Sequence, residues 1–124
     1  MIHTEKLYNK VIEYANLSKD DVVLDAYCGV GTIGMVMAPH YGLVIGVESN
    51  KQSVINARDN AYHNKVKNIR FVNQDATEFL INDDNKYDVV VMDPPKSGST
   101  VKFLSVLKKI APKELYMFHV KLKH

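Results

Sequence analysis

The chain has 124 residues, of which 46% are hydrophobic, and a formal net charge of +2 at pH 7. This length fits one domain with one packed core, and no stretch approaches the roughly 18 consecutive apolar residues of a membrane span. The first ten residues lack the apolar segment of a secretory signal, and the single cysteine, Cys28, excludes a disulfide framework or a Cys-rich metal site. We therefore expect a cytoplasmic protein without a membrane partner, whose mildly basic charge permits a nucleic-acid partner.

Apolar spacing and turn residues predict helices that alternate with short buried strands. In chain order we expect helix 4–17, strand 22–26, helix 30–38, strand 43–47, helix 51–64, strand 69–72, helix 76–81, strand 87–92, helix 101–110 and strand 115–120. Asn50 is the predicted N-cap of helix 51–64, and the apolar side of that helix carries Val54, Ile55, Ala57 and Ala61. This alternation predicts an α/β fold, a Rossmann-like, doubly wound and mainly parallel sheet covered by helices on both faces.

A carboxylate stands at the end of each of the first four predicted strands. These residues are Asp25, Glu48, Asp75 and Asp93. Ligands of such sheets bind beyond the carboxyl ends of the strands. Each acid could instead cap the following helix, but four of them beside a glycine loop predict a binding rim.

The stretch VVLDAYCGVGTIGM places Gly29, Gly31 and Gly34 at Gly-x-Gly-x-x-Gly spacing after the first strand. This spacing alone leaves two cofactors open, because a dinucleotide fold uses the same loop with an acidic residue about 20 positions on, where Glu48 stands. Asp25 favours the other cofactor, S-adenosylmethionine. A carboxylate beside the loop would repel a pyrophosphate, whereas S-adenosylmethionine has no phosphate and carries a cationic ammonium and a cationic sulfonium.

With this cofactor, Glu48 is expected to accept hydrogen bonds from the ribose hydroxyls, and Asp75 from the adenine amino group. The Asp93-Pro94-Pro95 turn after the fourth strand has restricted backbone angles and predicts a rigid ledge beside the methyl donor.

DAYCGVGTIG together with DPPKSG resembles the RNA uracil-5-methyltransferases, which methylate C5 of uridine in transfer or ribosomal RNA. The resemblance covers essentially the whole chain, and its Tyr-Cys-Gly-x-Gly form is fairly specific. It implies a class I methyltransferase fold, an RNA partner and cofactor contacts from Tyr27, Thr32, Glu48, Asp75 and Asp93. Lys96 replaces the family's more usual arginine, which keeps the charge but loses the planar fork.

The family's chemistry requires a cysteine that adds to C6 of uracil, and a base that removes the C5 proton. We reject Cys28 for this role, because it lies inside the cofactor loop, where its side chain is expected to pack as a small apolar group. The family's nucleophile follows the fifth strand, where this chain has no cysteine, and the family's catalytic glutamate is absent too. We therefore expect residues 1–124 to be a partial methyltransferase domain, truncated after about five strands, which binds cofactor but is inactive alone.

Two alternatives remain. The chain could be a complete small methyltransferase that acts on an amino group through Asp93-Pro94-Pro95, although such enzymes often have an aromatic residue where Lys96 stands. It could also be a non-catalytic interaction protein that self-associates through the exposed edge of its fifth strand.

Overall fold

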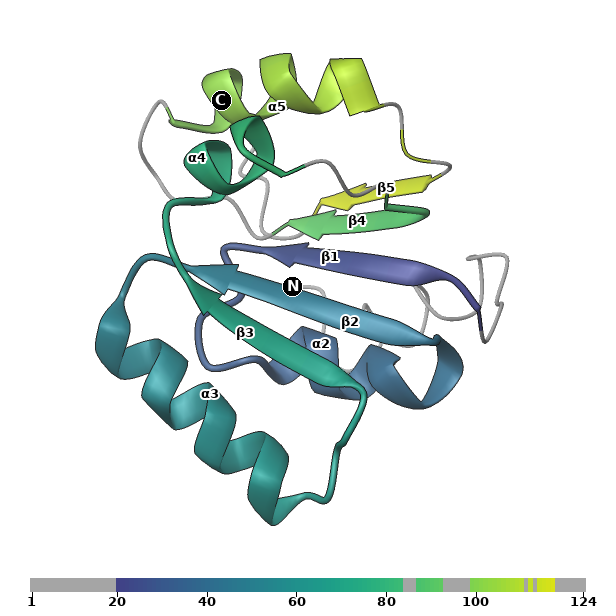
Figure 1. The fold of residues 1–124 in the computed structure, drawn as a ribbon, viewed down its shortest axis with the longest axis vertical. Coiled ribbons are helices and arrows are strands. Elements are labelled where there is room, and N and C mark those ends of the chain that lie inside the picture. Colours follow the sequence, from purple (N-terminus) through teal and green to yellow (C-terminus); the bar gives the residue numbers. More distant parts are fainter. Residues whose placement is uncertain (1–19, 84–86, 93–98, 111, 113, 118–124) are drawn as a thin grey trace, which may run out of the picture.

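In a computed structural model of the chain, the structure describes residues 20–83, 87–92, 99–110, 112 and 114–117. They form a five-stranded parallel sheet with the strand order β3-β2-β1-β4-β5 (Figure 1). The strands are β1 (Val22–Ala26), β2 (Leu43–Glu48), β3 (Ile69–Asn73), β4 (Val89–Met92) and β5 (Glu114–Met117). The helices are α2 (Thr32–Met37), the 3₁₀ turn η1 (Ala38–His40), α3 (Lys51–His63), α4 (Ala76–Ile81) and α5 (Ser99–Ile110). The predicted α/β fold is thus confirmed.

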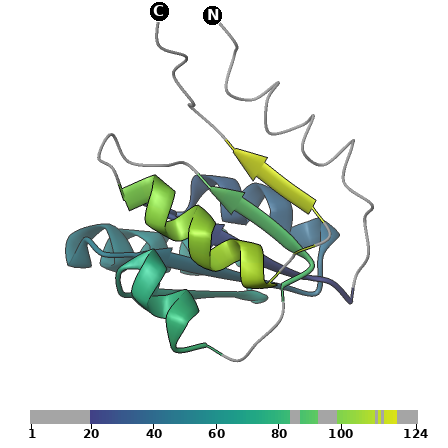
Figure 2. The same cartoon turned by 90° about the horizontal axis from the view of Figure 1, so that it is seen from above.

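Helices cover both faces of the sheet, with α2 and α3 on one side and α4 and α5 on the other (Figures 1 and 2). Side chains alternate along β1, so that Val23 joins the core beneath α2 and α3, whereas Leu24 and Ala26 join the core beneath α4 and α5. β4 is buried on both faces, which explains its uninterrupted apolar sequence VVVM. The predicted burial of the central strands is therefore correct.

Several predicted elements differ in detail from the structure; α5, for example, begins at Ser99 rather than at residue 101. The predicted helix 30–38 ends as α2 at Met37 and tightens into η1, because Pro39 has no N–H for the α-helical ladder. The fourth strand begins at Val89 rather than at residue 87. Ile55 is 39% exposed, so the buried face of α3 consists of Val54, Ala57 and Ala61, which recur at the three- and four-residue spacing of one helix face.

Some predictions fall on parts of the chain outside the described residues. These are helix 4–17, the end of the predicted strand 115–120, and the Asp93-Pro94-Pro95 turn with Lys96. Within the described part, no helix is long and apolar enough to cross a membrane, and no three His, Cys, Asp or Glu side chains are grouped to hold a metal ion.

Candidate functional site

Glu48, the last residue of β2, fastens the glycine loop to the sheet. Its Oε1 accepts a hydrogen bond from the Gly29 N–H at 3.0 Å, and its Oε2 accepts one from the Asn50 N–H at 2.8 Å. The Glu48 carbonyl is held in turn by the Asn73 side chain, at 3.0 Å, and by the Gln74 N–H. Both oxygens of a carboxylate can accept further bonds, so this fixed, half-buried anion is a preorganised acceptor at the carboxyl ends of the strands.

The loop between β1 and α2 contains three residues with left-handed backbone conformations. These are Tyr27 (φ 58°), Gly29 (φ 55°) and Gly31 (φ 85°). A Cβ on Gly29 would meet no atom within 4 Å, so this glycine borders open space. A Cβ on Gly31 would lie 2.8 Å from Cζ of Phe71, so this glycine is pressed against the core. The loop therefore has one face on open space beside Glu48 and one face on packed side chains.

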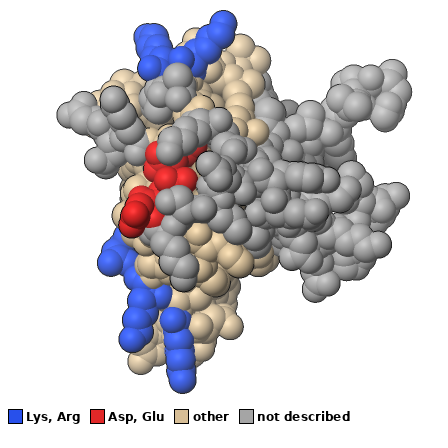
Figure 3. Space-filling view, turned by 90° about the vertical axis from the view of Figure 1, so that its right-hand side faces the viewer, with Lys and Arg blue, Asp and Glu red and all other residues tan. Residues whose placement is uncertain are grey.

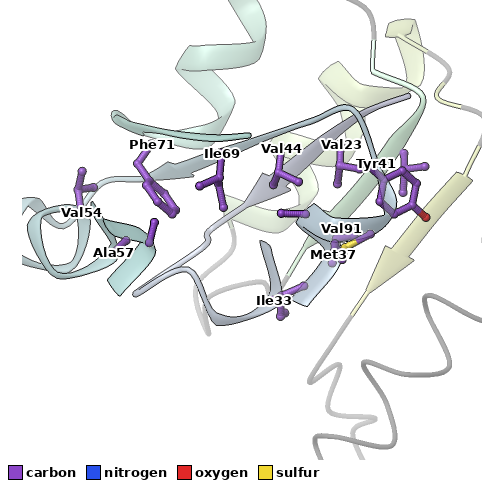
Figure 4. Close-up of a cluster of buried hydrophobic side chains, with 13 residues drawn as sticks. Val23, Ile33, Met37, Tyr41, Val44, Val54, Ala57, Ile69, Phe71 and Val91 are labelled. Atoms are coloured by element: carbon purple, nitrogen blue, oxygen red, sulfur yellow. The ribbon is translucent and has the colours of Figure 1, made fainter. Parts of the chain in front are cut away.

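Phe71 of β3 supports the loop from below and was not singled out from the sequence. Its ring lies in the core cluster with Val54 and Ala57 of α3 (Figure 4). A Cβ on Gly46 of β2 would also collide with this ring, at 2.8 Å from Cδ1. The sequence signal was the glycine inside the apolar strand LVIGV, since an interior strand glycine marks a close approach.

Cys28 packs at the same place. Its N–H donates to the Val47 carbonyl at 3.0 Å, and its Sγ would be 2.9 Å from a Cβ on Gly46. Burial raises the pKa of the Cys28 thiol strongly, and the charges of Asp25 and Glu48 raise it further. A reactive cysteine needs a lowered pKa, so the packing and the pKa both support the rejection of Cys28 as a nucleophile.

Asp25 differs from the expected rim carboxylate. It is 1% exposed, and its Oδ2 lies 3.0 Å from the position of a Cβ on Gly34 of α2. In register it pairs with Gly46 of β2 and Val91 of β4, inside the sheet. Among the carboxylates of the described residues, Glu48 therefore borders the open side of the glycine loop, whereas Asp25 is buried against its third glycine at the start of α2, where the helix dipole favours an anion.

The other predicted contacts occupy different places. Tyr27 packs edge-on against Phe103 of α5, with ring centroids 5.4 Å apart, and Thr32 is exposed at the start of α2. Asp75 caps α4, its Oδ2 accepting from the Glu78 N–H at 3.1 Å, so the capping interpretation holds for one of its oxygens. Asp93 lies outside the described residues. The structure thus brings together Gly29, Gly31 and Glu48.

This geometry disfavours a pyrophosphate ligand at the loop. A phosphate-binding loop presents its N–H groups to the ligand, but here the Gly29 N–H is bonded to Glu48 and the Gly31 N–H to the Cys28 carbonyl, at 2.9 Å. The group beside the open space is an anion. It suits a ligand that donates hydrogen bonds or carries positive charge.

A parallel sheet with a glycine loop and a carboxylate on neighbouring strand ends defines an α/β cofactor-binding domain. The chain belongs to the methyltransferase domain family, because the model of the family described as "Methyltransferase domain" matches residues 17–120. A Staphylococcus aureus (strain N315) relative named "Uncharacterized RNA methyltransferase" is 46% identical over 115 residues, which are 90% of this chain and 25% of the relative. A relative of the same name from Clostridium tetani is 41% identical over 117 residues, 92% of this chain and 25% of the relative. The chain thus spans about a quarter of the length of these curated relatives.

Solved structures share the fold. The Pyrococcus abyssi tRNA (uracil-54, C5)-methyltransferase in complex with S-adenosyl-L-homocysteine has a TM-score of 0.75 and 28% identity, covering 90% of this chain and 27% of that chain. An rRNA methylase from Streptococcus thermophilus has a TM-score of 0.76 at 12% identity, covering 97% of this chain and 75% of that chain, a likeness of fold alone.

Proposed function

We propose that residues 1–124 form part of the methyltransferase domain of an RNA methyltransferase that makes 5-methyluridine in transfer or ribosomal RNA. The observation that carries the cofactor-binding part of the proposal is the Glu48 carboxylate bonded to Gly29 at the open end of the loop. The cofactor of the domain is S-adenosylmethionine, which fits an anionic rim and needs no phosphate cradle. The names of the curated relatives support RNA as the substrate.

Glu48 and the glycine loop have different roles in binding the cofactor. Glu48 accepts hydrogen bonds from the ribose hydroxyls, and the missing side chain of Gly29 lets the ligand approach the backbone. Thr32, Tyr27, Asp75 and Asp93 supply further contacts, whereas Asp25, which is 1% exposed, lies beneath α2 and does not touch the ligand. When bound, S-adenosylmethionine supplies an electrophilic methyl group. Because the N–H groups of Gly29 and Asn50 already hold the Glu48 carboxylate, little side-chain entropy is lost on binding.

The uracil-5 assignment rests on the Tyr27-Cys28 pair within Tyr-Cys-Gly-x-Gly and on the similarity to the Pyrococcus abyssi enzyme. The covalent step of that chemistry needs a thiolate. Cys28 is the single cysteine of the 124 residues, and burial raises its pKa. We therefore propose that this chain binds cofactor without turning it over.

Isothermal titration with S-adenosylmethionine tests the cofactor assignment. We expect wild type to bind and Glu48→Ala to bind at least about 10-fold more weakly, because a hydrogen bond to a charged group contributes about 1.5–3 kcal/mol. The matched control is Glu78→Ala, an exposed acid on α4 whose side chain is outside the loop. Binding of NADH in place of S-adenosylmethionine would refute the proposal.

A methyl-transfer assay with radiolabelled S-adenosylmethionine and unmodified transfer or ribosomal RNA transcripts tests the second part. We expect cofactor binding without transfer to RNA by the 124-residue chain. Transfer to an amino group of RNA or protein would instead support a complete small methyltransferase.

A further inference from the structure

A cationic surface lies toward the C-terminal end of α3, away from the glycine loop. We define the α3–β3 basic patch as Arg58, Tyr62, Lys65, Lys67 and Arg70, which are all exposed. Figure 3 shows basic side chains gathered at the α3 end of the molecule, apart from a second basic group at the α5 end. From residue 58 to residue 71 the chain has four Lys or Arg residues and one acid, Asp59.

The patch surrounds a hollow of about 380 Å³ lined by Arg58, Tyr62, Lys67 and Arg70, among others. Tyr62 is 81% exposed, and its ring stands edge-on to His63 at 5.6 Å. An exposed aromatic ring beside cations is the combination that single-stranded nucleic acids use, with a base stacked on the ring and phosphates beside the charges.

The two arginines are held in place by backbone carbonyls. Arg58 donates to the Phe71 carbonyl at 3.0 Å, and Arg70 donates to the carbonyls of Lys67 and Ile69, each at 2.8 Å. A guanidinium has five N–H donors, so each retains donors for a phosphate. Within the described part of the chain, no carboxylate forms an ion pair with any of the four cations.

Lys65 occupies a position that favours glycine. The Val66 N–H bonds to the Ala61 carbonyl at 2.9 Å and the Lys65 N–H to the Tyr62 carbonyl at 3.1 Å, a Schellman motif that ends α3. Lys65 is the left-handed residue of this motif, with φ 58°. A lysine is strained there relative to glycine. Strain of this kind points to a role for the side chain.

We propose that the α3–β3 basic patch binds a single-stranded segment of the RNA, with a base stacked on Tyr62 and phosphates contacting the four cations. The inference rests on the proposed function for its choice of RNA. α3 has 13 residues and runs from the Glu48 end of the sheet to the patch, a length of about 20 Å. The patch therefore contacts RNA outside the nucleotide that receives the methyl group.

Fluorescence anisotropy with a labelled single-stranded oligouridine of about 12 nucleotides tests the patch. If four phosphates are contacted, the slope of log K against log salt is about −2.8, and removing two cations brings it to about −1.4. We expect this change for the double variant Lys65→Ala/Lys67→Ala. The matched control Lys108→Ala/Lys109→Ala removes the same charge from the exposed end of α5 and is expected to leave the slope unchanged. Equal slopes for the two double variants, or no binding by wild type, would overturn the proposal.

Two further variants separate stacking from charge and from folding. Tyr62→Ala is expected to weaken oligouridine binding about 5- to 150-fold with the salt slope unchanged, and Tyr62→Phe to retain binding. Lys65→Gly is expected to weaken binding while the melting temperature stays equal or rises. Preference for a hairpin duplex without an effect of Tyr62→Ala, or equally tight binding of polyglutamate, would refute the single-stranded RNA assignment.

Calorimetry with S-adenosylmethionine on the same variants distinguishes the two proposals. We expect the patch variants to bind cofactor as wild type does. If wild type does not bind S-adenosylmethionine, the proposed function is contradicted. The difference in salt slope between the two double-lysine variants tests the patch independently of cofactor binding.

Discussion

The close contact between Gly31 and Phe71 leaves no room for a side chain at residue 31, and a single substitution tests this. At Gly31→Ala, the new methyl group would lie 2.8 Å from Cζ and 2.9 Å from Cε1 of Phe71, at a backbone φ of 85°. The left-handed conformation costs about 1–2 kcal/mol for a residue other than glycine, and overpacking costs about 1–3 kcal/mol more. We therefore expect the free energy of unfolding to fall by about 2–5 kcal/mol.

Gly29→Ala is the matched control, because Gly29 is also left-handed but its Cβ would meet no atom within 4 Å. We expect it to cost about 1–2 kcal/mol from the backbone alone. The same methyl group would stand in the open space beside Glu48, so Gly29→Ala should weaken S-adenosylmethionine binding more than it weakens folding.

Urea unfolding measures both variants, provided that the m-value is unchanged. The double-mutant cycle of Gly31→Ala with Phe71→Leu isolates the clash, because the smaller side chain makes room for the methyl group. We expect a favourable coupling energy of about 1–3 kcal/mol. Equal destabilisation by Gly29→Ala and Gly31→Ala, together with zero coupling, would refute the claim that Phe71 supports the loop.

Three further predictions follow from other contacts. The pKa of Cys28 is raised in the folded state, so the free energy of unfolding should be constant below the unfolded pKa of about 8.5 and fall above it by up to about 1.4 kcal/mol per pH unit. Cys28→Ala should abolish this pH dependence, as measured by urea unfolding at several pH values. Iodoacetamide at about pH 8.5 should label the thiol only after unfolding. The Nδ2 of Asn68 donates to the carbonyls of Ala38, Tyr41 and Gly42 at 2.7, 3.0 and 3.4 Å. Asn68→Ala should lower the free energy of unfolding by about 1–3 kcal/mol, as measured by thermal or urea unfolding. Asn68→Asp should lower it more, because a carboxylate cannot donate. Val101 and Leu115, which are 73% and 42% exposed, line a hollow of about 600 Å³ between α5 and β5. The predicted self-association should therefore appear in sedimentation as a mass that rises with concentration, and Leu115→Lys should weaken it. A monomer at all concentrations would refute this prediction.

Much of the fold follows from local patterns in the sequence. The alternation of apolar strands with amphipathic helices predicted the α/β sheet, and Asn50 was recognised as an N-cap, which the 2.9 Å bond from the Ser53 N–H to its side chain confirms. α4 has the bounds expected from its sequence, Ala76–Ile81. Such features depend on residues within a few positions of one another, so a single sequence specifies them.

The sequence by itself determined the glycine loop, the carboxylates at the strand ends and the resemblance to a methyltransferase family. Only the tertiary structure decided which carboxylate borders the open side of the loop. β1 alternates its side chains between the two faces, which buries Asp25 beneath α2, while the pairing of β1 with β2 brings Glu48 to Gly29. Phe71 reaches Gly31 and Gly46 from a third strand, and the cations of the α3–β3 basic patch meet only because α3 turns back into β3. The contacts at the glycine loop join residues far apart in the chain, and the geometry of both the loop and the patch is set by strand register and helix packing, which no local pattern encodes.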